Sequence, residues 1–264
     1  MDLTPALIFR YINYKLLARH KKGFGIHSPF IFELVSKVFR NKIDNDIVLS
    51  IEKIRRKMKA DPGSIDVHDL GSGSAKLKTS LRKVSEIVKK SAVPRKYGIL
   101  LANMASAFGK PAVIEFGTSL GISTMYMAAS CNGCNVYTME GCAGTSDVAS
   151  ANFREAGLSN IVMLNGSFDE LLPGFKKMDL TPGLVFIDGN HRREPLLKYF
   201  DFVADISGSR TVAIIDDINL TAEMSEAWKE IKNHENVTTT VDIFRMGIVF
   251  FRKDLPRINY IIRY

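Results

Sequence analysis

The feature that most constrains the fold is a repeated exchange of short apolar strands and amphipathic helices after residue 111. Apolar runs bounded by glycine, asparagine and aspartate alternate with longer segments of helical periodicity. The predicted strands cover 112–117, 135–140, 161–165, 184–188 and 211–216. The predicted helices cover 121–130, 146–157, 168–177, 192–206 and 221–234. This alternation is typical of an α/β fold with a mostly parallel sheet and helices on both faces.

The C-terminal part breaks this alternation. Strands are predicted over 237–244 and 247–253, and only Arg245 and Met246 separate them, which requires an antiparallel hairpin. The hairpin brings the predicted sheet to seven strands and gives it a Rossmann-like character. We therefore expect a main domain over 94–264, preceded by a helical extension over 1–93 that is a candidate substrate lid.

Helices in the extension are predicted over 3–20, 30–40, 44–59 and, as a basic helix, 74–90. A further helix, 94–108, leads into the sheet. Residues 3–20 carry an apolar stripe, so this helix either packs on the core of the chain or makes peripheral contact with a membrane surface. The glycine-rich loop Asp69–Ser74 is interpreted either as a flexible connection or as a lid near the site.

Charge and hydropathy limit the classes of function. The net charge is +8, with +12 over residues 1–100 and −4 over 101–264. The basic part could attract nucleic acid, an anionic membrane or an acidic substrate, or be a solvated lysine-rich surface. No apolar run of about 18 residues predicts a transmembrane helix. The N-terminus lacks the pattern of a signal peptide, so a cytoplasmic location is expected.

The three cysteines do not form a disulfide framework. Cys131 and Cys134 form a C-x-x-C pattern around an Asn-Gly turn, and Cys142 lies shortly after them. A structural zinc site needs four ligands, and no histidine is nearby in the sequence. Ordinary turn and core cysteines are therefore expected.

The first predicted strand runs into the sequence AVIEFGTSLGIS, residues 112–123. Gly117 and Gly121 allow a sharp turn and a close approach of the backbone to a ligand. The first N–H groups of the following helix favour a polar or anionic group there. This arrangement predicts a site for a nucleotide-like cofactor, although the spacing differs from the G-x-G-x-x-G loop of NAD-binding proteins.

Acidic and polar residues follow the other strands where ligands of open parallel sheets bind. Glu140 ends the second strand, 19 residues after Gly121, where a carboxylate can accept both hydroxyls of a ribose. The remaining strand ends carry Asn165-Gly166-Ser167, Asp188-Gly189-Asn190-His191 and Asp216-Asp217.

Together, the glycine loop, the acid at 140 and the sequences FIDGNH and IIDDIN resemble class I S-adenosylmethionine-dependent methyltransferases over about residues 95–253. The resemblance is to the small-molecule O-methyltransferases of the catechol and caffeoyl-CoA type, and to an uncharacterised bacterial branch. It implies S-adenosylmethionine as cofactor. The residues that it implies for binding are Glu115, Gly117, Thr118, Ser119, Gly121, Ser123, Glu140, Gly141, Ser167, Phe168 and Asp188.

The same resemblance implies a divalent cation, Mg²⁺, Ca²⁺ or Mn²⁺, held by Asp188, Asp216 and Asp217. It implies His191, Asp188 and Asp216 as catalytic residues. His191 stands where the family has a lysine, and its near-neutral pKa suits a general base. Structural alternatives remain open: Ser167 as a helix cap, His191 as a simple partner of an acid, and the aspartates as caps.

The sequence therefore predicts methyl transfer to a small-molecule acceptor, most readily to an oxygen. One alternative is a nucleic-acid methyltransferase, which the absence of an N-P-P-Y-like sequence after the fourth strand disfavours. The other is a non-catalytic, cofactor-binding or membrane-associated member of the fold. The acceptor and a homodimeric state are left open.

Overall fold

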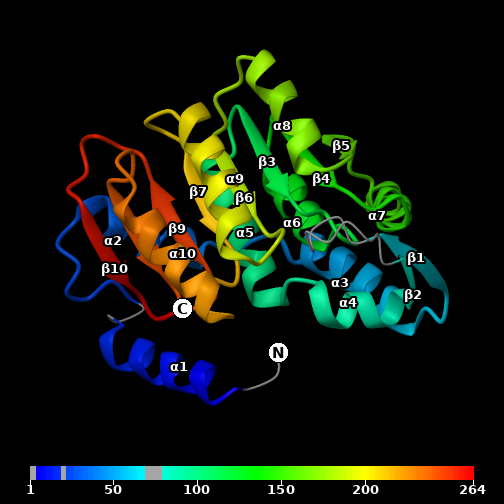
Figure 1. Cartoon of the computed structure of the whole chain (residues 1–264), viewed down its shortest axis with the longest axis horizontal. Helices are drawn as coiled ribbons and strands as arrows, with labels where there is room; N and C mark the ends of the chain where they lie inside the picture. The colour runs from blue at the N-terminus through cyan, green and yellow to red at the C-terminus, as the bar shows by residue number, and fades with distance from the viewer. Residues whose placement is uncertain (1–3, 19–21, 69–78) are drawn as a thin grey trace. The chain divides into compact units, whose positions relative to one another are not determined.

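The computed structural model of the chain describes residues 4–18, 22–68 and 79–264 (Figure 1). These residues form two compact units. Unit 1 consists of residues 1–41 and 181–264, and unit 2 is the uninterrupted segment 42–180. Each unit combines parallel strands with helices, so the predicted α/β class is confirmed.

The strands of unit 2 that carry the glycine loop and Glu140 are parallel. They are β3 (Ala112–Phe116), β4 (Asn135–Glu140) and β5 (Ile161–Asn165), in that order. Every residue of β3 is buried, as expected for a strand covered on both faces. Because the strands run in the same direction, the end of β3 and the end of β4 lie at the same edge.

Helices fix the orientation of the segment that follows β3. The helices of unit 2 are α3 (Asn45–Ala60), α4 (Val84–Ser91), α5 (Arg95–Phe108), α6 (Ile122–Ser130), α7 (Ala143–Glu155) and α8 (Phe168–Lys177). Tyr126 of α6 is fully buried, and its hydroxyl donates to Oε1 of Glu52 on α3 at 3.0 Å. A Cβ at Gly98 of α5 would lie 2.5 Å from the Tyr126 ring. These close contacts hold α6, and with it the glycine loop.

Two predicted helices of unit 2 need correction. The segment 74–90 is not one basic helix, because β2 (Thr79–Lys83) pairs antiparallel with β1 (Ser64–His68), and among the residues of this segment that the structure describes only those of α4 are helical. Pairing with β1 outweighs the helical propensity of this lysine-rich sequence. Helix α7 begins at Ala143, before the predicted start at residue 146. The loop Asp69–Ser74 lies outside the described residues.

Unit 1 contains β6 (Leu184–Ile187), β7 (Val212–Ile215), β8 (Thr239–Asp242), β9 (Gly247–Phe250) and β10 (Ile258–Ile261), in the order β10-β8-β9-β7-β6. Strands β6 and β7 are parallel, and β9 is antiparallel to β7 and β8. The predicted hairpin is confirmed, but its turn spans residues 243–246. The predicted seven strands omitted β10, which pairs parallel with β8.

The helices of unit 1 are α1 (Pro5–Leu17), α2 (Pro29–Ser36), the 3₁₀ helix η1 (Val38–Arg40), α9 (Arg193–Ile206) and α10 (Ala222–Asn233). Helix α10 lies over β9, where the ring of Trp228 leaves room only for a glycine at 247 (Figure 1). Helix α1 is tied to the C-terminal strand region, because the Tyr14 hydroxyl donates to the carbonyl of Ile262 at 2.6 Å. The predicted packing of this helix on the core of the chain is thus observed for one of its faces.

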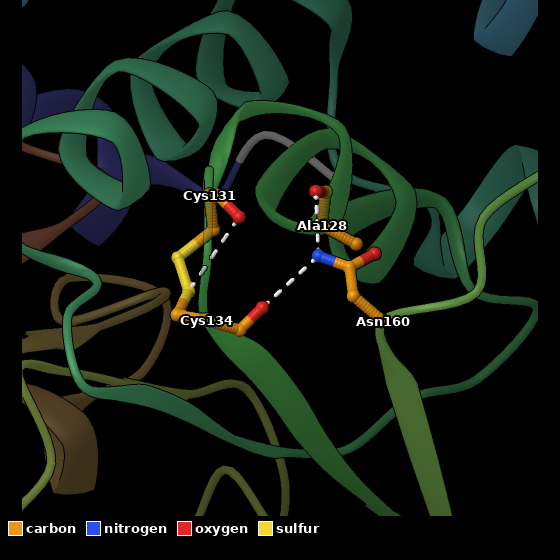
Figure 2. Close-up of a disulfide and its surroundings, with 4 residues drawn as sticks. All are labelled: Ala128, Cys131, Cys134 and Asn160. Atoms are coloured by element: carbon orange, nitrogen blue, oxygen red, sulfur yellow. Dashed lines mark hydrogen bonds between the residues drawn. A yellow bond between two sulfur atoms is a disulfide. The ribbon is translucent and has the colours of Figure 1, made fainter.

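The cysteine prediction is wrong for two of the three residues. Cys131 and Cys134 form a disulfide at the end of α6, with their Cα atoms 5.7 Å apart (Figure 2). The Asn-Gly turn between them brings the two side chains to bonding distance. Asn160 supports this turn, because its amide donates to the carbonyl oxygens of Ala128 and Cys134. Cys142 is buried and is not part of this disulfide.

Candidate active site

The loop between β3 and α6 adopts a conformation that depends on glycine. Gly117 has a φ of 96° and Gly121 a φ of 83°, both in the left-handed region that other residues avoid. Ser119 between them also has a positive φ, 49°. A Cβ at Gly121 would lie 2.4 Å from the ring of Phe153, so a larger residue would displace the loop. The sequence prediction of a tight turn is therefore confirmed.

Glu140 is held in a fixed position among the residues of unit 2 that are predicted to bind the cofactor. Its Oε2 accepts a hydrogen bond from the backbone N–H of Ser119 at 2.7 Å, and its Oε1 accepts one from the N–H of Cys142 at 3.0 Å. Burial raises the pKa of Glu140, while these N–H groups favour its charged form. Each carboxylate oxygen has a second lone pair for a hydroxyl donor. Gly141 is the half-buried residue that separates Glu140 from Cys142.

Glu115 lies inside unit 2. Its side chain is fully buried, and its Oε2 accepts hydrogen bonds from the hydroxyls of Thr124 and Thr138. Burial raises the pKa of Glu115 to about 7. Its Oε1 is buried and has no hydrogen-bond partner among the described residues. This acceptor is the atom of Glu115 that a ligand or an ordered water would satisfy.

Thr118 and Ser123 are also buried. The Thr118 hydroxyl lies 2.5 Å from the hydroxyl of Thr138, so it belongs to the same internal network as Glu115. Ser123 is in the first turn of α6. These two residues support the loop from within, and direct contact with a cofactor stays a prediction for both.

Ser167 caps α8. Its hydroxyl accepts from the N–H of Glu170, and the Glu170 carboxylate accepts from the N–H of Ser167, which is a capping box. Phe168, the next residue, is half-buried and packs edge-on against Phe116 with the ring centres 5.4 Å apart. The cap is an observed role of Ser167. Contact of either residue with an adenine stays a prediction.

The predicted acids of unit 1 do come together, around a cation that the sequence analysis missed. Asp216 is fully buried, and the guanidinium of Arg245 binds it in a two-pronged ion pair, with Nε 2.9 Å from Oδ1 and Nη2 2.5 Å from Oδ2. The same Nη2 lies 3.5 Å from Oδ1 of Asp217. Although burial opposes the charge, Asp216, Asp217 and Asp188 raise the pKa of Arg245. We call these four residues, together with His191, the acid cluster.

Asp217 is the most strained member of the acid cluster. It has a φ of 53°, and its buried Oδ1 has no hydrogen-bond partner among the described residues. Burial raises the pKa of Asp217 to about 7, and the charge of Asp216 adds to this effect, while Arg245 opposes it. Near neutral pH this carboxyl group can therefore both hold and release a proton.

His191 is partly exposed and lies beside Asp188, with Nε2 3.7 Å from Oδ1. Burial lowers the pKa of His191 below 6.5, and the charge of Asp216 partly offsets this. The imidazole is therefore mostly neutral at pH 7 and can accept a proton. Its position next to Asp188 was predicted, because both residues follow the same strand.

The residues present do not fit the predicted divalent cation. Among the described residues, no group of three or more acids, cysteines and histidines has the arrangement of a metal site. The positive charge that balances Asp216 and Asp217 comes from Arg245. The sequence signal for Arg245 was weak, because the local pattern predicts it only as part of a hairpin turn. Pairing of β9 with β7, which sets Gly247 opposite Ile215, is what carries the turn to the aspartates.

Comparison with known proteins shows which proteins this chain is similar to. Residues 114–218 match a family model described as a methyltransferase domain. This segment is therefore similar to a methyltransferase domain. All the predicted site residues lie within the matched segment, whereas Arg245 lies beyond its end. A search of curated proteins finds no significant match.

Solved structures share the methyltransferase fold. The O-methyltransferase TomG from Streptomyces achromogenes, in complex with SAM, is 17% identical with a TM-score of 0.58, over 80% of this chain and 91% of that one. The cofactor-bound protein Rv0187 from MTB is 16% identical with a TM-score of 0.56, over 96% and 100%. An O-methyltransferase from Bacillus cereus, in complex with SAH, is 16% identical with a TM-score of 0.57, over 90% and 99%. These similarities establish a Rossmann-like methyltransferase fold.

Proposed function

We propose that this chain transfers a methyl group from S-adenosylmethionine to an oxygen of a small-molecule acceptor. The observation that carries the proposal is the geometry of Glu140. Its carboxylate is held at the end of β4 by a backbone N–H of the glycine loop, so the acid and the loop form one rigid receptor. A ribose needs a fixed acceptor of this kind beside a loop that the backbone can approach.

Other features of unit 2 fit the same cofactor. The left-handed glycines at 117 and 121 leave the loop without side chains at those points. The buried, unpartnered Oε1 of Glu115 is an acceptor that bound ligand or water would satisfy. The proposal includes the remaining predicted residues of this loop and of the β5–α8 connection as cofactor neighbours.

S-adenosylmethionine supplies a methyl group made electrophilic by its positively charged sulfur. The protein is left with two tasks: aligning the acceptor oxygen and removing its proton. We assign proton removal to His191, whose lowered pKa keeps the imidazole neutral at pH 7. Asp217, with a pKa of about 7, is the second group that can exchange a proton there. Asp188 beside His191 orients the imidazole and stabilises its protonated form.

Binding of S-adenosylmethionine measured by calorimetry tests the proposal. Glu140→Gln keeps the size of the side chain but removes the charge that strengthens the ribose hydrogen bonds, so we expect a loss of about 1.5–3 kcal/mol. Glu86→Gln, an exposed acid of α4, is the matched control and leaves affinity unchanged. Absence of binding in the wild type would overturn the proposal.

A pH profile of the transfer rate tests the assignment of the base. We expect the rate to rise with pH through an apparent pKa below 6.5, and this limb to disappear in His191→Gln. A variant with an unchanged profile would leave His191 a structural partner of Asp188. The cytoplasmic location and the homodimer remain predictions that cell fractionation and light scattering can check.

A second proposal concerns the outer face of α1, where we infer peripheral contact with an anionic membrane. No described helix is long and apolar enough to cross a membrane. Phe9, Leu16 and Leu17 of α1 are nevertheless 64%, 76% and 66% exposed, and Lys15 lies beside them. An exposed apolar stripe flanked by basic residues is typical of helices that lie at a membrane surface.

Vesicle pelleting distinguishes this contact from a solvated surface. Phe9→Ser and Leu16→Ser remove exposed apolar area without touching Tyr14, which holds the helix in place. We expect wild-type protein to pellet with anionic vesicles and the double variant to stay in solution. The matched control is Leu81→Ser, a substitution of an equally exposed leucine of β2. Equal pelleting of all three proteins would contradict the proposal, and a dimer that the double variant loses would assign the stripe to a second copy of the chain.

A further inference from the structure

The acid cluster contains a built-in cation. Arg245 binds both oxygens of Asp216 and lies 3.5 Å from Asp217. The charge of Asp188 also acts on the guanidinium. The three carboxylates that the resemblance implied as metal ligands therefore surround one arginine side chain.

The geometry of the ion pair is that of a permanent contact. Two N–H groups of one planar guanidinium meet the two oxygens of one carboxylate, the arrangement that gives arginine–carboxylate pairs their strength and direction. Asp216 is fully buried, and only 17% of the Arg245 side chain is exposed. Removal of the arginine would leave a buried carboxylate without its counter-charge, so the pair is maintained by its own burial.

Hydrogen bonds to the main chain of the turn hold Arg245 in this position. Its carbonyl accepts a hydrogen bond from the N–H of Ile218 at 3.1 Å. The preceding residue, Phe244, has a φ of 73° and accepts a hydrogen bond from the amide of Asn219 at 2.8 Å. Arg10 of α1 donates in turn to the carbonyl of Asn219 at 3.0 Å. The turn that carries Arg245 is thus anchored to the segment after β7.

A divalent cation bound by the same acids would lie next to this guanidinium. Two positive groups a few ångströms apart in a mostly buried site repel each other strongly, and the acids cannot face both at short distance. The guanidinium is covalently part of the chain and is always charged, so it competes at an effective concentration that a dissolved metal does not reach.

We propose that Arg245 is the resident cation of the acid cluster and excludes a divalent metal from it. Methyl transfer by this chain then proceeds without a metal, and the acceptor needs only one oxygen in the site, because no metal ion is held there to chelate two. Only this last consequence rests on the proposed function. The exclusion of a metal ion from the acid cluster can be tested without any cofactor.

Titration with Mn²⁺, followed by the spin resonance signal of the free ion, tests the exclusion directly. We expect no saturable binding to the wild type at millimolar Mn²⁺. Arg245→Met frees the three acids, and we expect a site at least tenfold tighter than any in the wild type, which Asp188→Asn in the same background weakens. Arg252→Met, which removes an exposed arginine paired with Asp254, is the control and gains no site.

The opposite results overturn the proposal. Sub-millimolar Mn²⁺ binding to the wild type that Asp188→Asn abolishes would make the metal the resident cation. A folded Arg245→Met protein that gains no site would show that the arginine is not what excludes the metal. If the methionine variant does not fold, Arg245→Gln keeps hydrogen-bond donors without the charge and is expected to gain the same site. None of these outcomes depends on S-adenosylmethionine binding, which is measured separately.

Discussion

Each of the two units buries carboxylates, but the units stabilise them in opposite ways. In unit 2, Glu115 and Glu140 are surrounded by hydroxyl and backbone N–H groups, and both pKa values are raised by burial. In unit 1, Asp216 is paired with the full charge of Arg245. Neutral hydroxyl and N–H donors leave a carboxylate able to accept further hydrogen bonds from neutral groups. An ion pair instead holds the carboxylate against one charged partner. The first environment suits recognition of a polar cofactor, and the second suits a site that handles protons.

The difference also predicts different responses to mutation. A buried ion pair is costly to break from one side, because the remaining charge is left without compensation. Replacing a buried acid that is held by neutral donors with its amide leaves no bare charge behind, so the cost is limited to the donor that loses its acceptor, about 1–3 kcal/mol. The following predictions are ordered by the size of the expected effect.

Arg245→Met should be the most destabilising of these changes. It leaves Asp216 buried and unpaired, so we expect the free energy of unfolding to fall by about 3–5 kcal/mol in urea titrations. Arg252→Met, at an exposed pair, should change it by less than about 1 kcal/mol. The double variant Arg245→Met with Asp216→Asn should recover part of the loss. Equal effects at the two arginines would break the contrast between the units.

Glu115→Gln should change how stability depends on pH. The folded pKa of about 7 lies above the ordinary value of 4.5, so the native state keeps the proton longer than the unfolded chain. Wild-type stability should therefore fall as pH rises from 4.5 to 7 and level off above that. Relative to the glutamine variant, the fall should approach about 3 kcal/mol. Unfolding curves that stay parallel from pH 4 to pH 8 would contradict a raised pKa.

Gly121→Ala should weaken cofactor binding more than it weakens the fold. The added Cβ both contacts Phe153 and strains a left-handed residue, so we expect affinity for S-adenosylmethionine to fall by about 1–3 kcal/mol in calorimetry. Gly157→Ala is the matched control, because its φ is also positive, at 68°, but no atom lies within 4 Å of the added Cβ. That variant should lose some stability and keep full affinity.

Ser167→Ala should give the smallest effect. Loss of an N-cap lowers the free energy of unfolding by about 1 kcal/mol. Thr221→Ala at the cap of α10 provides the comparison. Because the Ser167 hydroxyl is engaged with Glu170, we expect unchanged cofactor affinity. A loss of affinity confined to the Ser167 variant would instead give this hydroxyl a direct contact with the ligand.

Local patterns in the sequence predicted the parts of the site that depend on single strands. The order of strand, glycine turn and helix around Gly117 and Gly121 predicted the tight turn of that loop from the local sequence alone. The position of Glu140 followed from the end of the next strand. Asp188 and His191 were placed together because they follow one strand. In each case the residues involved are neighbours along the chain or ends of parallel strands.

Arg245 could not be predicted in the same way, because its role depends on which strand the hairpin pairs with. The register that sets Gly247 opposite Ile215 links residues that no local pattern connects. Strand β2 was missed for the same reason, since its partner β1 is separated from it in the sequence by residues 69–78. The inward orientation of Glu115 was not predictable either, because a strand covered on both faces gives no sign of which side is polar.

The attachment of α1 to Ile262 has a consequence for how the protein is synthesised. Tyr14 and Ile262 are 248 residues apart, so α1 meets this partner only after the residues between them have been synthesised. Unit 2 is an uninterrupted segment, so all of its own strands are synthesised before residues 181–264. We therefore expect unit 2, which carries the predicted cofactor loop, to fold first in the nascent chain. The acid cluster would form later, because its residues lie in the segment 181–264.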